Sequence, residues 1–169
     1  AWTSAGGEIL FIETSRTKGE GKVQITGQLG DVMKESVQIA LTLVKSMFPE
    51  EAETLNESDI HIHVPAGAVP KDGPSAGITI VTALTSMLKG KGISPEYAMT
   101  GEVSLRGGVM PIGGLPEKLM AAQRAGIRTV FIPYENRDDL EDVADEVKED
   151  LTIIPVKRIE EVLQKTNLI

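Results

Sequence analysis

Apolar side chains recur at helical spacing over two long stretches of the chain. Residues 32–48 have an apolar face, with lysine, glutamine and threonine opposite, which predicts an amphipathic helix. Asp31 is its expected N-cap, and Pro49 follows its expected end. A second helix is predicted over residues 75–88, and because it is apolar nearly all round we expect it to be buried.

Alternation of apolar and polar residues predicts strands. Residues 59–64 alternate strictly, with isoleucine and valine on one face and His61 and His63 on the other, which indicates a half-buried strand. A loop at residues 16–21 is expected to join the first two strands as a hairpin. The other predicted strands cover residues 7–14, 22–26, 98–105, 109–112, 129–133 and 151–156.

The remaining segments complete an α+β pattern. Residues 65–74 are rich in glycine and proline and predict a loop. A helix is expected after Gly114, because Pro116 suits a first helical turn. An acidic surface helix is predicted at residues 136–143 and a terminal helix at residues 159–166. No repeat or linker divides the chain, so we expect one domain over residues 1–169, with small mixed sheets and packed helices.

Composition narrows the range of functions. Of the 169 residues 41% are apolar and 25% are charged, as in a soluble globular fold. The formal charge of −8 and the 4% aromatic content argue against a nucleic-acid binder. No membrane span or secretory signal is visible, and the first residue is not methionine, which suggests a fragment of a longer chain. Without cysteine there are no disulfides or thiol nucleophiles, which fits a reducing compartment.

The strongest candidate for chemistry is Ser75. It follows the glycine- and proline-rich loop and begins the predicted buried helix, where unpaired backbone N–H groups can stabilise an oxyanion. The alternative is an ordinary N-cap. The number of glycines and prolines before Ser75 favours a reactive hydroxyl, because a simple N-cap does not need a loop of such defined conformation before it.

A serine nucleophile needs a base, and the chain offers two kinds. His61 and His63 share one strand face, although they are also compatible with an open polar face or with a metal site that lacks an evident third ligand. Lys118 lies near the start of the helix after Gly114. The helix dipole and burial both disfavour its charged form, so its pKa can fall from about 10.4 toward the neutral range that a base requires.

Three segments resemble the C-terminal proteolytic domain of bacterial Lon proteases. They keep the order and spacing of that family, and the similarity extends from Trp2 to about Leu163. Residues 26–36 and 64–68 support it. The three segments read Pro70-Lys71-Asp72-Gly73-Pro74-Ser75-Ala76-Gly77, Met99-Thr100-Gly101-Glu102-Val103-Ser104-Leu105-Arg106-Gly107 and Pro111-Ile112-Gly113-Gly114-Leu115-Pro116-Glu117-Lys118.

The resemblance implies a serine protease with a Ser–Lys dyad and no histidine base. Ser75 matches the nucleophile and Lys118 the general base, and Thr100 matches a threonine that helps to orient the lysine. Asp72 matches an acidic residue that can hold the site in an inactive arrangement. At position 116 this chain has a proline where many family members have a lysine. Lys118 is therefore the only lysine of this turn.

The resemblance also implies partners and a setting. We expect unfolded or damaged proteins as substrates, a homohexamer in the full-length protein, and a cytoplasmic location without membrane or nucleic-acid partners. The backbone N–H groups around Ser75 and Ala76 are the expected oxyanion site. We expect no cofactor here: ATP and magnesium belong to an ATPase module outside this sequence, because Gly21-Lys22 is followed by Val23 and lacks the hydroxyl of a P-loop.

Two other functions remain as alternatives. One is a non-catalytic Lon-like scaffold module of a DNA-repair ATPase, in which Ser75 and Lys118 would be structural and a basic face should exist. The other is a small-molecule phosphotransferase, in which the loop before Ser75 would hold phosphate. The acidic charge and the complete set of Ser75, Lys118 and Thr100 favour the protease.

Overall fold

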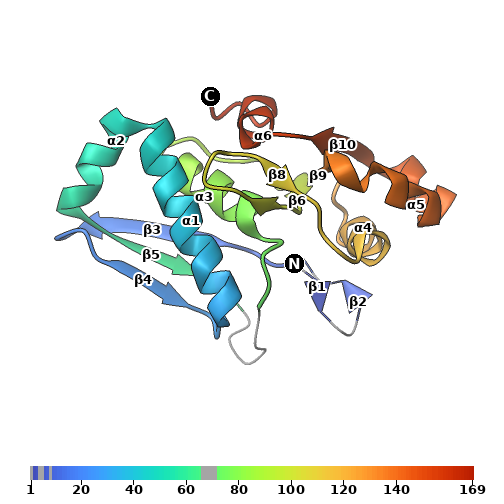
Figure 1. Ribbon diagram of the computed structural model, residues 1–169, viewed down its shortest axis with the longest axis horizontal. Helices are drawn as coiled ribbons and strands as arrows, with labels where there is room; N and C mark the ends of the chain where they lie inside the picture. The colour runs from blue at the N-terminus through green and yellow to red at the C-terminus, as the bar shows by residue number, and fades with distance from the viewer. Residues whose placement is uncertain (1, 4–5, 8, 66–71) are drawn as a thin grey trace.

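The computed structural model describes residues 2–3, 6–7, 9–65 and 72–169 (Figure 1). Most of the predicted loop at 65–74 therefore lies outside the described residues. The helices are α1 (Asp31–Met47), α2 (Pro49–Glu53), α3 (Gly77–Lys89), α4 (Leu115–Arg124), α5 (Asp145–Asp150) and α6 (Ile159–Lys165), with 3-10 helices η1 (Thr54–Glu57) and η2 (Tyr134–Asp142). The strands are β1 (Trp2–Thr3), β2 (Gly6–Gly7), β3 (Glu13–Lys18), β4 (Val23–Thr26), β5 (Ser58–His63), β6 (Tyr97–Met99), β7 (Glu102–Val103), β8 (Val109–Met110), β9 (Thr129–Pro133) and β10 (Thr152–Val156).

One end of the molecule is a mixed three-stranded sheet in the order β3-β5-β4. Strand β5 runs antiparallel to β3 and parallel to β4, so the predicted hairpin between the first two strands is wrong. The buried side chains of Ile60 and Ile62 place β5 at the centre, where both of its edges are paired. The first strand also starts later than predicted, at Glu13, because its register follows β5.

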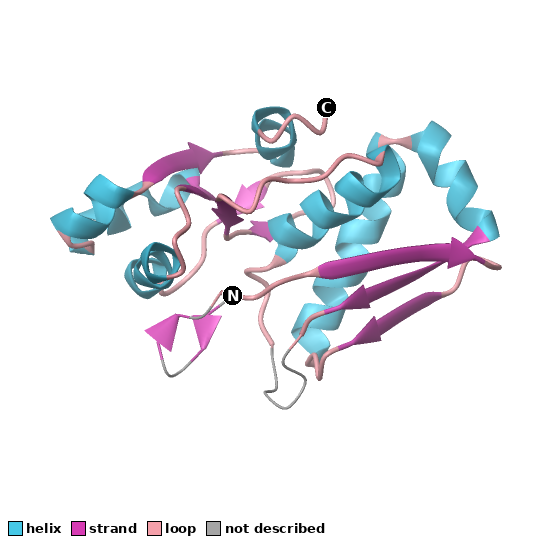
Figure 2. Cartoon of the chain, turned by 180° about the vertical axis from the view of Figure 1, so that it is seen from behind, coloured by secondary structure: helices cyan, strands magenta, loops and turns pink. Residues whose placement is uncertain are grey.

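Helix α1 lies across this sheet, as Figures 1 and 2 show from opposite sides. Its apolar face packs with α3 and the sheet in the larger core cluster, which confirms the predicted amphipathic and buried helices. The predicted N-cap is wrong: Gly30 occupies the cap position, and Asp31 is the first helical residue. Since glycine has no side chain, the cap of α1 must come from elsewhere.

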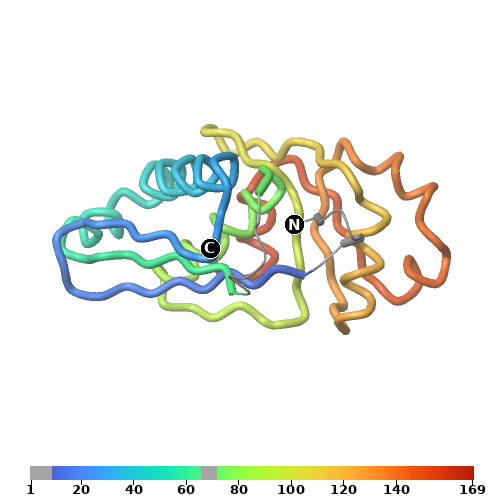
Figure 3. Tube along the Cα trace, turned by 90° about the horizontal axis from the view of Figure 1, so that it is seen from below, coloured from blue at the N-terminus to red at the C-terminus, as the bar shows by residue number. Residues whose placement is uncertain are grey.

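The other end is a parallel sheet in the order β10-β9-β6, accompanied by α4 and α5 (Figure 3). Val130 and Ile132 of β9 pack with buried residues of α4 and α5 in a second core cluster, whereas Phe131 of β9 and Val156 of β10 belong to the larger one. The predicted strand at residues 98–105 is two strands, β6 and β7, in different sheets, because the chain turns at Thr100 and Gly101. The predicted acidic helix is the 3-10 helix η2.

The turn between β6 and β7 joins the two ends. The Thr100 N–H donates to the Phe131 carbonyl of β9 at 3.1 Å, and the Gly101 N–H donates to the Ser75 carbonyl at 2.8 Å. The segment before α3 is thus fixed to the centre of the fold. Within the described ranges, no helix combines the length and the apolar character needed to cross a membrane.

Candidate active site

Ser75 lies in a tight turn directly before α3. The turn is closed by a hydrogen bond from the Gly77 N–H to the Pro74 carbonyl at 3.2 Å. Gly77 is required because a Cβ there would come within 2.9 Å of the Val103 backbone nitrogen. Ser75 is buried, with 9% of the residue's surface exposed. The backbone that carries this hydroxyl is therefore held in one place directly before α3.

Lys118 is buried in the first part of α4. Gly114, with a φ of 73°, is the N-cap of this helix, and its carbonyl accepts the Lys118 N–H at 3.1 Å. Burial lowers the pKa of the Lys118 ammonium to about 8. Its Nζ donates to Thr100 Oγ1 at 3.4 Å, and no carboxylate among the described residues forms an ion pair with it.

Ser75 and Lys118 line one cleft of about 480 Å³. In the described part of the chain no hydrogen bond joins Ser75 Oγ to Lys118 Nζ; such contacts often tighten only with substrate in place. Neither histidine lines the cleft. Its walls are formed by Asp72, Gly73, Pro74, Ser75, Pro111, Ile112, Gly113, Gly114, Glu117 and Lys118.

Asp72 belongs to the cleft but points its carboxylate at α1. Its Oδ1 accepts the Met33 backbone N–H at 2.9 Å and so supplies the cap that Gly30 lacks. The backbone N–H groups of Met33 and Gly73 hold the pKa of Asp72 below its usual value. In this structure the residue anchors the loop before Ser75 to α1. Its expected ability to hold the site in an inactive arrangement stays a prediction.

Ala76 is the residue between Ser75 and α3. Within the segments that the structure describes, the backbone N–H groups of Ser75 and Ala76 have no hydrogen-bond partner. They lie beside the Ser75 side chain at the positive end of a 13-residue helix. This arrangement is compatible with an oxyanion site, which stays a prediction.

The two histidines are engaged elsewhere. Thr26 Oγ1 lies 2.8 Å from His61 Nε2 and 2.6 Å from His63 Nδ1. Both rings are half-buried on the polar face of β5, as the alternation predicted. Among the described residues no group of three or more histidine or acidic side chains could hold a metal ion. Lys118 is therefore the base candidate that shares a cleft with Ser75.

Asn136 supports the wall of the cleft without lining it, and the sequence did not reveal this residue. Its amide is 3% exposed and bonds to both backbone groups of Ile112, with Oδ1 accepting the N–H at 2.9 Å and Nδ2 donating to the carbonyl at 2.8 Å. The residue lies in an acidic segment that predicted a solvated helix. Because its bonds go to backbone 24 positions away, no side-chain pattern signals them.

The fold and the cleft define an α+β domain in which a buried serine and a buried lysine line the same cleft. Residues 1–168 match the model of the Lon protease (S16) C-terminal proteolytic domain, and the chain belongs to this family. Family membership makes it a serine protease domain and does not support the non-catalytic alternative.

Three relatives illustrate the similarity. The chain is 60% identical to a Lon protease of Clostridium beijerinckii over 98% of its length, and 55% identical to one of Methanosarcina barkeri over 98%. It is 56% identical to the Lon protease of Escherichia coli K12 over 96%. In each case the match covers 21% of the relative, so the chain spans about a fifth of these proteins.

Proposed function

We propose that this domain hydrolyses peptide bonds with Ser75 as nucleophile and Lys118 as general base. The observation that carries the proposal is that Lys118, with a pKa of about 8, lines the same cleft as Ser75. At neutral pH a usable fraction of such an amine is uncharged and can accept a proton. Thr100, bonded to Nζ, orients the amine.

The reaction follows from these positions. Lys118 takes the Ser75 proton as the hydroxyl oxygen attacks the peptide carbonyl, and the backbone N–H groups of Ser75 and Ala76 stabilise the oxyanion. Lys118 then gives its proton to the leaving amine. Water, deprotonated by the same lysine, hydrolyses the acyl-enzyme and returns Ser75 to its starting form.

For the full-length protein we propose an ATP-driven protease of unfolded or damaged proteins, a homohexamer in the cytoplasm with a role in protein quality control and stress response. Family membership and the greater length of the relatives support this. ATP and magnesium are assigned to another part of that protein. Lys22 leads into strand β4 rather than a helix, and its N–H donates to Asp59 Oδ1 at 2.9 Å, which does not fit a phosphate loop.

Cleavage of an unstructured polypeptide without nucleotide, over a range of protein concentrations, tests the domain's activity. Ser75→Ala should lower turnover by about 1000-fold or more. Ser36→Ala is the matched control, because Ser36 is equally buried but bonds to Val32 in α1. Turnover that survives in Ser75→Ala, or a demonstrated hexamer that cleaves nothing, would contradict the proposal.

A further inference from the structure

Asn136 fixes one residue of the cleft wall from behind. The side-chain amide bonds to the N–H and to the carbonyl of Ile112, as a neighbouring strand would. The second Nδ2 proton goes to Asp139 Oδ2 at 2.7 Å, so the donors of the buried amide are both used. This wall segment is therefore held by one side chain rather than by a sheet.

The geometry of the two peptide bonds on either side of Ile112 determines which backbone groups point away from Asn136. In a trans peptide the C=O and the N–H point in opposite directions, and the described chain contains no cis peptide bond. Because Ile112 turns both of its groups toward Asn136, the Pro111 carbonyl and the Gly113 N–H point away from it. Both residues line the cleft with Ser75, and neither group has a hydrogen-bond partner within the described segments.

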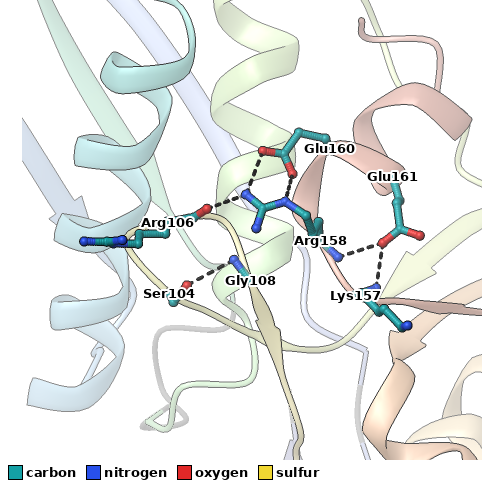
Figure 4. Close-up of polar contacts among 7 residues, drawn as sticks. All are labelled: Ser104, Arg106, Gly108, Lys157, Arg158, Glu160 and Glu161. Carbon is teal, nitrogen blue, oxygen red and sulfur yellow. Dashed lines mark hydrogen bonds and ion pairs between the residues drawn. The ribbon is translucent and has the colours of Figure 1, made fainter.

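The segment that leads into this wall is also held in place (Figure 4). Arg158 donates to the Arg106 carbonyl at the tip of the β7–β8 hairpin and pairs with Glu160. The Val109 N–H donates to the Lys157 carbonyl at 2.9 Å. The hairpin is thus tied to the start of α6, and the two residues after β8 enter the cleft from a fixed position.

We propose that residues 111–113 are a preformed edge on which the main chain of an extended peptide substrate docks, with Asn136 as its positioning residue. The Pro111 carbonyl accepts a substrate N–H, and the Gly113 N–H donates to a substrate carbonyl. Both contacts are to backbone, so they select an extended, unfolded polypeptide without selecting its sequence. This inference rests on the proposed protease function and adds where the substrate binds.

A scan of N-methylated peptides in the full-length protein tests the edge. One peptide of known cleavage site is methylated at one backbone nitrogen at a time, which removes one donor without changing the side chains. Methylation of the one nitrogen whose N–H the Pro111 carbonyl accepts should raise KM about tenfold, because that hydrogen bond is lost, with little change in kcat. In Asn136→Ala the parent peptide should already show the higher KM, and methylation at that position should add less than about twofold.

Controls separate this proposal from loss of folding and from failure of the protease function. Thr166→Val removes the hydroxyl of another buried side chain that bonds to backbone. This residue ends α6 and does not line the cleft, so the variant should leave the N-methyl profile unchanged. Asn136→Asp keeps the acceptor for the Ile112 N–H but loses the donor, and serves if the alanine variant does not fold. Equal methylation profiles in wild type and in the Asn136 variants would overturn the edge, whereas cleavage that survives Ser75→Ala would overturn the protease proposal.

Discussion

The Asp72 carboxylate accepts the Met33 N–H of α1 at 2.9 Å, although the two residues lie 39 positions apart. The bond caps a helix whose own N-cap residue is Gly30, and it ties the loop that carries Ser75 to the larger core. A Cβ on Gly30 would come within 2.3 Å of Asp72 Cγ, so the glycine makes room for this cap. Helix stability and nucleophile position are therefore linked in one contact.

Asp72→Ala should lower the unfolding midpoint by about 2–4 °C and reduce peptide cleavage, because α1 loses its cap and the loop its anchor. Asp72→Asn keeps an acceptor oxygen and should lose less. Thermal unfolding at pH 7 measures the difference, and Glu35→Gln, an exposed carboxylate on α1, is the control. Equal midpoints for Asp72→Ala and wild type would refute the capping role.

The same contact gives stability a dependence on acid. The folded pKa of Asp72 lies below its unfolded value, so the stabilisation is present above the unfolded pKa of about 3.9 and is lost as pH falls through the folded pKa. The stability difference between wild type and Asp72→Asn should shrink over that acidic range. Denaturant unfolding at a series of pH values measures it; a difference that stays constant would count against the assignment.

Activity should rise with pH toward the pKa of Lys118. Since only the neutral amine accepts the Ser75 proton, kcat/KM should increase nearly tenfold per pH unit below about 8 and level off above it. Steady-state cleavage of a short peptide between about pH 6 and pH 9 provides the profile. A flat profile over this range would exclude Lys118 as the titrating base.

Burial of the Lys118 ammonium should also lower the free energy of unfolding. The pKa of Lys118 is about 8 in the folded protein and 10.5 in the unfolded chain. This loss of folding stability therefore has its full size below pH 8, where the buried amine is charged, and it disappears as pH rises to the unfolded pKa. The difference corresponds to about 3 kcal/mol, an upper value. Lys118→Met should therefore be inactive but more stable at pH 7, and the gain should vanish near the unfolded pKa, as denaturant unfolding can show.

Sequence reasoning pointed to those parts of the candidate site that a local motif carries. Ser75 and Lys118 lie at the starts of α3 and α4, close to where the segments around them predicted, since a turn before a helix and the first turn of a helix are local features. Thr100 was indicated by the family resemblance alone, and the strand predicted over residues 98–105 is interrupted by the turn that contains it. Sequence reasoning failed where a strand or a side chain bonds to backbone that is distant in the sequence. The insertion of β5 between β3 and β4, and the bond from Asn136 to Ile112, depend on residues that chain folding brings together, and neither alters the periodicity of the sequence.

Thr100→Val should lower kcat about tenfold and leave KM nearly unchanged, because the valine keeps the shape but loses the oxygen that Lys118 Nζ contacts. Thr100→Ser restores a hydroxyl and should recover most of the loss. Steady-state kinetics on one peptide compare the three proteins. A loss in KM alone would assign Thr100 to substrate binding instead.

Gly77→Ala should disturb the nucleophile through packing alone. The added Cβ meets the Val103 backbone nitrogen at 2.9 Å, and this atom cannot rotate away as a side chain could. The start of α3 must therefore shift from β7, which we expect to cost about 1–3 kcal/mol and to move Ser75 away from Lys118. Gly92→Ala is the matched control, since nothing lies within 4 Å of its Cβ. Unfolding free energies and cleavage rates of both variants test this. Because the clash lies two residues from Ser75, Gly77→Ala should lose activity under conditions in which it is still fully folded. Gly92→Ala should match wild type in both measurements.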